Sequence, residues 1–454
     1  MRDARTTAAL LSAAVAVAIA ATWLTPAVRG APRDASGPLA VRAALGSTRV
    51  AVGDGEAHMV VTVRAPERAE RRRPPLHLAI VIDRSGSMAG DKLAQAKRAA
   101  RQLVERLDER DRVAVVAYGS QPALLTPAEP ATPRHVAAAL AAIDRLVDDG
   151  GTNLSGGLVT GRDELLPWRS ATAVSRVVLI SDGLANEGIT APDELAQLAR
   201  STAERGVSIT TVGVGLDFDE QTMTAIAVAG AGHYYFAEHA DALADIFDAE
   251  LARVGETVAT DVRVAITPAP GVDVVDAYGY DIARDGRTAR IAIADVHAGE
   301  TRKVVVRLRV RADRPGHVDV AAVRVAYRAV SDGHSRTADA SATAIATADP
   351  RDILDHADRD AMLLIERART AAALRDATDR YSRGDREGAL DVLRARKAEV
   401  KQIAKSLAFK ELDKDVAAAT DEAAAEFSRG SDRFGASGAR AKKRIRKRAY
   451  DLTY

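Results

Sequence analysis

Oxygen-bearing side chains at three separate points of the chain have the types and spacing of a binding site for a hard cation. The first group lies in Asp83–Ser87, whose sequence Asp-Arg-Ser-Gly-Ser offers one carboxylate and two hydroxyls. A hydroxyl at Thr152 and a carboxylate at Asp182 follow much later in the chain. Oxygen ligands without nitrogen or sulfur are those that magnesium, manganese and calcium prefer. The candidate ligands are Asp83, Ser85, Ser87, Thr152 and Asp182.

Both carboxylates stand where a buried strand is expected to end. Asp83 follows the apolar run 78–82, and Asp182 comes shortly after the run 177–180. Such runs predict central strands of a parallel sheet that is covered on both faces. Ligands of these sheets bind beyond the carboxyl ends of the strands, so the two carboxylates are expected at one edge. In a local alternative, Asp83 only ends a strand and the serines only cap a helix. Three segments in this order favour the metal site.

The pattern Asp-x-Ser-x-Ser, a distant Thr and a distant Asp followed by Gly resembles the von Willebrand factor type A (VWA) family and its metal-ion-dependent adhesion site. The resemblance covers the α/β segment of the chain, which is well under half of its length. It implies one bound divalent cation, Mg²⁺ or alternatively Mn²⁺ or Ca²⁺. The implied ligands are the hydroxyls of Ser85, Ser87 and Thr152, together with Asp83 and Asp182 directly or through water.

The expected role of this site is the capture of a carboxylate. Because the hydroxyl ligands are neutral, few formal charges reach the cation, which keeps an affinity for one more anionic oxygen. In the VWA family the open position takes a carboxylate from a partner protein. Side chains that surround the site and set specificity are expected at Arg84, Met88, Asn153, Leu184 and Asn186.

The segment 76–254 alternates strands and helices, which predicts a doubly wound α/β domain with a mostly parallel sheet. Strands are expected at 77–82, 112–118, 176–181, 208–213 and 233–236, with a weak edge strand near 123–125. Helices are expected at 92–107, 134–146, 154–165, 192–205, 220–229 and 240–254.

Strand-like segments stand on both sides of this domain, at 32–75, which includes a linker, and at 255–349. The N-terminal strands are too few to bury a core alone. We therefore expect both segments to form one β-sandwich into which the α/β domain is inserted. The alternative is two separate small β units.

The C-terminal part is expected to be helical over 350–429. Residues 377–390 resemble one tetratricopeptide helix-turn-helix, and a lone repeat cannot form a solenoid, so we expect a helical hairpin. A dense basic run follows within 430–454. This tail either contacts an anionic surface of the cell envelope or is a solvated helix that ends the fold.

The N-terminus predicts export. Arg2 and Arg5 precede the apolar stretch 8–24, and small residues follow it up to residue 31. This is the pattern of a secretory signal peptide, and the alternative is an uncleaved membrane anchor. Both interpretations predict an extracytoplasmic protein, secreted or periplasmic. The sequence contains no cysteine, which excludes disulfides and thiolate metal sites.

Other chemistry finds little support in the sequence. The 64 Lys and Arg balance the 63 Asp and Glu, and aromatics are only 4%, so nucleic-acid binding by charge or stacking is not expected. The nine histidines stand singly, and neither His-Glu-x-x-His nor Gly-x-Ser-x-Gly occurs. We therefore predict a metal-dependent protein-binding module and no enzyme. The alternatives are a scaffold of an envelope complex and, less favoured, a metal-dependent hydrolase.

Overall fold

The computed structural model describes residues 37–67, 73–182, 184–216, 218–237, 242–293, 295–429 and 436–454. All of these residues belong to one compact unit, 34–454. The expected signal peptide or anchor, 1–31, lies outside the described residues. Among the residues that are described, no helix has both the length and the apolar character needed to cross a membrane.

The α/β domain is built on a six-stranded sheet with the order β6-β5-β4-β7-β8-β9. Its strands are β4 (Leu76–Asp83), β5 (Arg112–Tyr118), β6 (Pro122–Pro130), β7 (Val174–Ser181), β8 (Ser208–Val214) and β9 (Tyr234–Ala237). Only β6 pairs antiparallel, and the other strands are parallel. Every residue of β4 and β7 is buried, as the uninterrupted apolar runs predict. The expected doubly wound sheet is confirmed, and its edge strand is longer than predicted.

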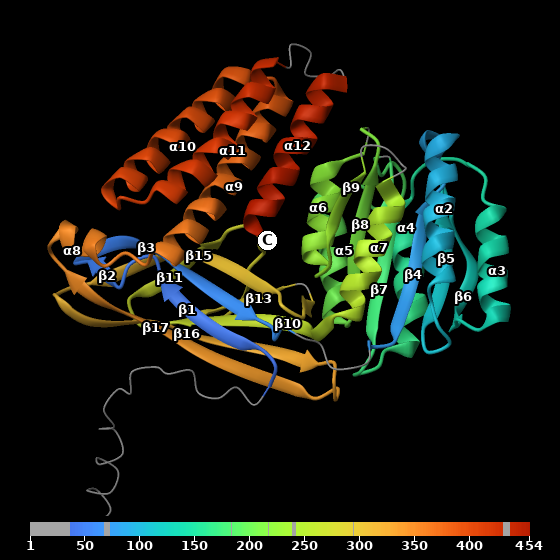
Figure 1. The fold of residues 1–454 in the computed structure, drawn as a ribbon, viewed down its shortest axis with the longest axis horizontal. Coiled ribbons are helices and arrows are strands. Elements are labelled where there is room, and N and C mark those ends of the chain that lie inside the picture. The colour runs from blue at the N-terminus through green and yellow to red at the C-terminus, as the bar shows by residue number, and fades with distance from the viewer. Residues whose placement is uncertain are drawn as a thin grey trace, which may run out of the picture. The chain divides into compact units, whose positions relative to one another are not determined.

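Helices cover both faces of this sheet (Figure 1). They are α2 (Asp91–Glu105), α3 (Pro133–Asp144), α4 (Leu154–Leu165), α5 (Pro192–Glu204), α6 (Glu220–Ala229) and α7 (Leu243–Gly255), with the short 3-10 turns η1 (Gly86–Met88) and η2 (Leu166–Trp168). One apolar cluster holds Leu93 of α2 and Phe247 of α7. The opposite cluster holds Leu158 of α4, Leu195 of α5 and Ile226 of α6.

Strands from before and after the α/β domain pair directly with each other. In a four-stranded sheet, β1 (Ala40–Leu45), β3 (Gly53–Arg64), β15 (Thr301–Ala312) and β11 (Val272–Ala277) follow in this order. The ladder between β3 and β15 runs from Gly53 opposite Ala312 to Arg64 opposite Thr301. This is the pairing on which the sandwich prediction depends.

A second sheet shares a core with the first. It consists of β12 (Ala283–Asp285), β13 (Thr288–Ala292), β10 (Thr257–Pro268), β16 (Gly316–Ala329), β17 (Ser335–Thr347) and β2 (Arg49–Ala51), and β14 (Val296–His297) pairs with β10. Met59 and Val306 from the first sheet and Val264 and Val325 from the second are buried in one cluster. We refer to the two sheets together as the β region.

The C-terminal helical region consists of α8 (Pro350–Asp355), α9 (Arg359–Arg383), α10 (Arg386–Ser406), α11 (Lys410–Arg429) and α12 (Ala436–Thr453). The expected hairpin turn lies between α9 and α10. Gly384, at φ 95°, ends α9, and the Asp385 side chain accepts a hydrogen bond from the Gly388 amide at the start of α10.

The basic segment at the C-terminus is a packed helix. Ile445 and Ala449 of α12 are buried in the same cluster as Leu374 of α9 and Phe427 of α11. Figure 1 shows α12 beside the other long helices of this region. The helical region is therefore larger than the expected hairpin, because α11 and α12 bury their apolar faces against α9. In α12 this packing is made by the apolar residues that stand between the basic ones.

Candidate functional site

The two candidate carboxylates lie at the carboxyl edge of neighbouring strands. Ile82 of β4 pairs with Ile180 of β7. Asp83 is the last residue of β4, and Asp182 directly follows β7. The turn η1 comes directly after β4. Adjacent parallel strands thus bring together two carboxylates that are almost a hundred residues apart in the chain.

Asp83 is fully buried and held by two hydrogen bonds. Its Oδ1 accepts from the Ser85 amide at 2.8 Å, and its Oδ2 accepts from the Ser181 hydroxyl at 2.7 Å. Burial raises the pKa of the Asp83 carboxyl, and the hydrogen bonds from Ser181 and Ser85 counteract this increase. Each carboxylate oxygen has two lone pairs, so both oxygens can accept a second contact. The carboxylate is therefore oriented in advance.

A chain of oxygens connects the serines to the second carboxylate. The hydroxyl oxygens of Ser85 and Ser87 are 3.1 Å apart, and the Ser87 hydroxyl donates to Asp182 Oδ1 at 2.8 Å. Asp182 is fully buried, whereas Ser87 is exposed. The structure therefore brings Asp83, Ser85, Ser87 and Asp182 into one cluster that opens to solvent at Ser87.

Thr152 reaches the same edge through the glycine-rich loop before α4. The Gly86 amide of η1 donates to the Gly150 carbonyl at 3.2 Å, which ties this loop to the serine turn. Thr152 is buried, and its amide donates to Asn186 Oδ1 at 2.8 Å. Asn186 in turn donates its own amide to the Thr152 carbonyl at 3.2 Å. The loops that carry the threonine and the second aspartate are thus fixed to each other.

Lys92 is a member of the cluster that the sequence analysis did not identify. Its Nζ donates to Asp182 Oδ2 at 2.5 Å, so Ser87 and Lys92 engage the two oxygens of one carboxylate. Lys92 lies in the first turn of α2. A lysine near the start of a helix is usually interpreted as a surface residue whose charge is solvated. In the sequence, only the short separation between Lys92 and Ser87 could have indicated that Lys92 belongs to this cluster.

The residues that we expected around the site have different roles. Leu184 is 58% exposed, Arg84 forms an ion pair with Asp149 at 3.1 Å, and Asn153 caps α4 by accepting from the Gly156 amide. The expectation that Met88 lies at the rim of the site is wrong, because Met88 is a core residue. It is fully buried in the apolar cluster under α2, because the η1 turn directs its side chain into the domain.

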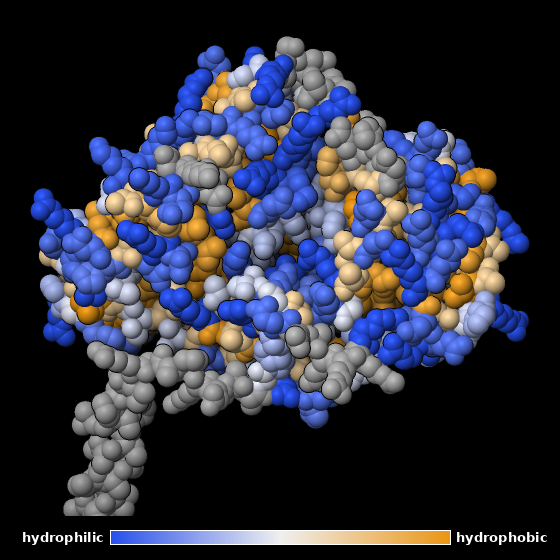
Figure 2. Space-filling view, viewed as in Figure 1, coloured by the Kyte–Doolittle hydropathy of each residue, from blue (hydrophilic) through white to orange (hydrophobic). Residues whose placement is uncertain are grey.

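Two loops that carry candidate site residues also carry exposed apolar side chains. Among the described residues, Val147 and Leu184 are the most exposed large hydrophobics, at 65% and 58%. Val147 shares the loop of Thr152, and Leu184 follows Asp182 closely in the chain. The molecular face drawn in Figure 2 is largely hydrophilic, with apolar side chains in separate patches. A partner that contacts these two loops would meet exposed apolar side chains as well as polar groups.

The donor set fits a hard divalent cation. It contains two carboxylates and three hydroxyls and no imidazole or thiol. Among the described residues, no group of three or more His, Cys, Asp or Glu side chains could hold a metal. A metal site at this edge would therefore need the serine and threonine hydroxyls as ligands, as the sequence pattern predicts.

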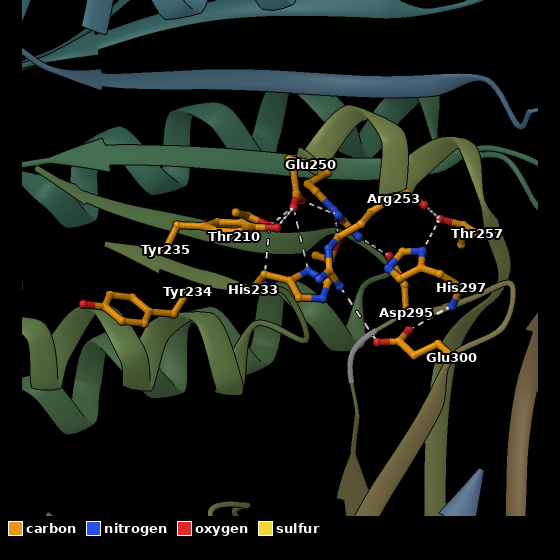
Figure 3. Close-up of polar contacts among 12 residues, drawn as sticks. Thr210, His233, Tyr234, Tyr235, Glu250, Arg253, Thr257, Asp295, His297 and Glu300 are labelled. Carbon is orange, nitrogen blue, oxygen red and sulfur yellow. Dashed lines mark hydrogen bonds and ion pairs between the residues drawn. The ribbon is translucent and has the colours of Figure 1, made fainter. Parts of the chain in front are cut away.

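A second charged cluster is buried where the α/β domain meets the β region (Figure 3). Arg176 of β7 is fully buried and pairs with Glu250 of α7 and with Asp295, which precedes β14. Arg302 of β15 contacts His233 Nε2 at 2.9 Å. Because these opposite charges are buried in pairs, we interpret the cluster as a structural junction.

Comparison with known proteins identifies the family of the α/β domain. Residues 77–249 match the family model described as von Willebrand factor type A domain. The uncharacterized protein YfbK of Escherichia coli (strain K12) is 30% identical over 208 residues, 45% of this chain and 36% of that protein. The uncharacterized protein sll0103 of Synechocystis is 24% identical over 285 residues, 61% of this chain and 67% of that protein. The E3 ubiquitin-protein ligase WAV3 of Arabidopsis thaliana is 26% identical over 262 residues, 57% of this chain and 34% of that protein. The chain thus spans about a third of the length of YfbK and WAV3.

Solved structures resemble nearly the whole fold. A von Willebrand factor type A protein from Catenulispora acidiphila superposes with a TM-score of 0.68 at 18% identity, covering 92% of this chain and 97% of that one. The ArnB paralog VWA2 from Sulfolobus acidocaldarius superposes with a TM-score of 0.62 at 16% identity, covering 91% of this chain and 99% of that one. At these identities the likeness concerns the fold alone, but it extends beyond the α/β domain.

Proposed function

We propose that this chain, whose residues 77–249 form a VWA domain, binds a partner protein through a divalent cation at the carboxyl edge of the sheet. VWA domains generally act in protein–protein interaction. One observation carries the proposal, namely the oxygen chain from Ser85 through Ser87 to Asp182, beside the buried carboxylate of Asp83. Two buried carboxylates at one strand edge are costly unless cations neutralise them.

The residues of the site would divide the work. The hydroxyls of Ser85, Ser87 and Thr152 would bind the cation, which is Mg²⁺ in our proposal, without neutralising its charge. Asp83 and Asp182, fixed by their hydrogen bonds, would supply negative charge directly or through water. When bound, the cation would supply a positive charge that attracts a carboxylate oxygen of the partner.

The surroundings of the site support a protein as the partner. Val147 and Leu184 are exposed apolar side chains on the two loops that border the site. A partner that presents a carboxylate beside apolar groups would contact the cation and these side chains together. We propose an extracytoplasmic location, which rests on Arg2, Arg5 and the apolar stretch 8–24.

A scaffold role without a metal is the second candidate. The packing of α12 against α9 and the contact of Lys443 with the Phe218 carbonyl at 3.0 Å join the helical region to the VWA domain. Such a joined unit could dock to an envelope complex through its helices. Catalysis is less favoured, because Asp182 is engaged by Lys92 and Asp83 by Ser181, and neither is placed as a general base.

Isothermal titration calorimetry of Mg²⁺ against the full chain tests the metal site. We expect the Asp83→Ala variant to lose Mg²⁺ binding while circular dichroism still reports a folded protein. Asp148→Ala removes an exposed carboxylate from the neighbouring loop and should leave the affinity unchanged. Equal affinity of the wild type and Asp83→Ala would refute the assignment of the site.

Pull-down from an envelope extract separates adhesion from scaffold. Metal-bridged binding predicts a captured protein that EDTA releases and that Asp83→Ala fails to capture. A partner that the wild type and Asp83→Ala retain equally in EDTA would favour the scaffold role.

A further inference from the structure

The candidate metal centre contains a cation of its own. The Lys92 ammonium lies 2.5 Å from Asp182 Oδ2, and the carboxylate is fully buried while the lysine side chain is 28% exposed. The second oxygen of Asp182 accepts from the Ser87 hydroxyl. A metal that approaches Asp182 therefore meets a carboxylate that already has a positive partner.

Lys92 is held in this position by its surroundings. It stands in the first turn of α2, whose neighbouring residues Leu93 and Ala96 are buried in the core of the domain. Its side chain passes over Gly215, where an added Cβ would lie 3.2 Å from Lys92 Cε and 3.5 Å from Nζ. Gly215 has a φ of +77°, so glycine both permits the turn and leaves room for the lysine. The ammonium is thus directed at the site by the fold.

The charges of the site show what this ammonium does. Asp83 and Asp182 are opposed by Lys92, and the hydroxyl ligands are neutral, so one net negative charge faces an incoming metal ion. With a divalent cation bound, the site carries one net positive charge. Without Lys92 the occupied site would be neutral. Since charges interact strongly when buried, this difference affects both the metal and any carboxylate that binds to it.

We infer that Lys92 is a tethered second cation of the site, which weakens the binding of the divalent cation and strengthens the binding of a carboxylate to the occupied site. The inference rests on the proposed function. It makes the site a weak metal binder when alone and a stronger one when a carboxylate ligand is present, because binding of the two ligands is then mutually reinforcing.

Calorimetry with Mg²⁺ alone tests the first half of the inference on the full chain. Lys92→Met removes the ammonium and keeps a long side chain, and we expect about tenfold tighter Mg²⁺ binding. Lys92→Arg retains the charge and should stay close to the wild type. Lys97→Met removes the same charge from α2, where the ammonium bonds to the Asp144 and Leu146 carbonyls, and should not change the affinity.

Acetate tests the second half as a carboxylate probe. The relaxation of the acetate methyl protons by the Mn²⁺-loaded protein reports acetate at the bound metal. At matched metal occupancy, we expect several-fold weaker acetate binding to Lys92→Met than to the wild type. Thermal unfolding adds a readout of stability, because Mg²⁺ should raise the Tm of Lys92→Met more than that of the wild type.

The outcomes separate this inference from the proposed function. If the wild type binds Mg²⁺ and Lys92→Met binds it no more tightly, the role of Lys92 is refuted and the metal site stands. If only Lys92→Met binds Mg²⁺, the role of Lys92 is supported. If neither protein binds Mg²⁺ or Mn²⁺, both proposals are refuted, and Lys92 is then a structural counterion of Asp182.

Discussion

Arg176 of strand β7 donates a hydrogen bond to Asp295 of the β region at 2.6 Å, and both side chains are buried. The same guanidinium pairs with Glu250 of α7, which also accepts from the Tyr235 hydroxyl at 2.8 Å (Figure 3). One arginine therefore compensates two buried carboxylates that come from different parts of the chain. Buried ion pairs therefore hold the VWA domain and the β region together at this point.

Replacing Arg176 with methionine should destabilise the protein strongly. The substitution leaves the carboxylates of Glu250 and Asp295 buried without their cation, which costs about 3–5 kcal/mol of unfolding free energy. Urea unfolding measures this cost. Arg394→Met, which removes one partner of an exposed ion pair with Asp391, is the matched control and should have little effect. A small effect at Arg176 would mean that water reaches this junction.

Acid should weaken the same junction through His297. Burial, together with nearby Arg176 and His233, lowers the pKa of His297 to about 2, from about 6.5 in an unfolded chain. Below pH 6.5 the unfolded chain binds a proton that the folded protein excludes. The stability is therefore complete above this pH and falls as the pH decreases.

His297→Gln should make the unfolding free energy fall less between pH 6.5 and pH 5 than it does in the wild type. The comparison uses urea unfolding at several pH values. His317→Gln, which alters an exposed histidine, should keep the slope of the wild type. The raised pKa of Asp295, caused mainly by burial, acts in the opposite direction and stabilises the fold as the carboxyl gains a proton. An unchanged slope in His297→Gln would show that this histidine has the same pKa in the folded and unfolded states.

The α/β domain could be predicted from the sequence because its strands are buried on both faces. Burial on both faces requires uninterrupted apolar runs, as in β4 and β7, and such runs are visible without knowledge of the neighbours. The expectation that Asp83 and Asp182 lie at one edge of the sheet followed from the same reasoning, since both come where these runs end.

Other features depend on contacts that the sequence does not display. The strand β17 has only a weak apolar alternation in the sequence, because its buried positions are mostly alanines such as Ala342 and Ala344. For a related reason Lys92 was missed, and Met88 was wrongly expected at the rim of the site. Their roles depend on where η1 and α2 place them relative to Asp182 and to the core.

Lys443 in the basic segment should stabilise the fold, because its side chain is buried and does not belong to the charged surface. It is buried, its Nζ donates to the Phe218 carbonyl, and it lies 3.3 Å from the centre of the Phe218 ring. Lys443→Met should lower the unfolding free energy by about 1–3 kcal/mol, because a charged hydrogen bond and a cation–π contact are lost. Lys447→Met, at a partly exposed position, should have little effect. Equal effects of both changes would contradict a special role of Lys443.

Gly161 fixes the distance between α4 and the sheet, and through it the loop that carries Thr152. A Cβ at Gly161 would lie 2.6 Å from Val81 Cγ2, closer than side chains can approach. Gly161→Ala should therefore push α4 away from β4, lower the unfolding free energy by about 1–3 kcal/mol, and weaken Mg²⁺ binding by displacing Thr152. Urea unfolding and calorimetry measure the two effects. Gly55→Ala, where the added Cβ would meet only Ala51 at 3.7 Å, is the control and should change neither. A loss of stability in Gly161→Ala without any loss of Mg²⁺ affinity would contradict the expected coupling between the packing of α4 and the metal site.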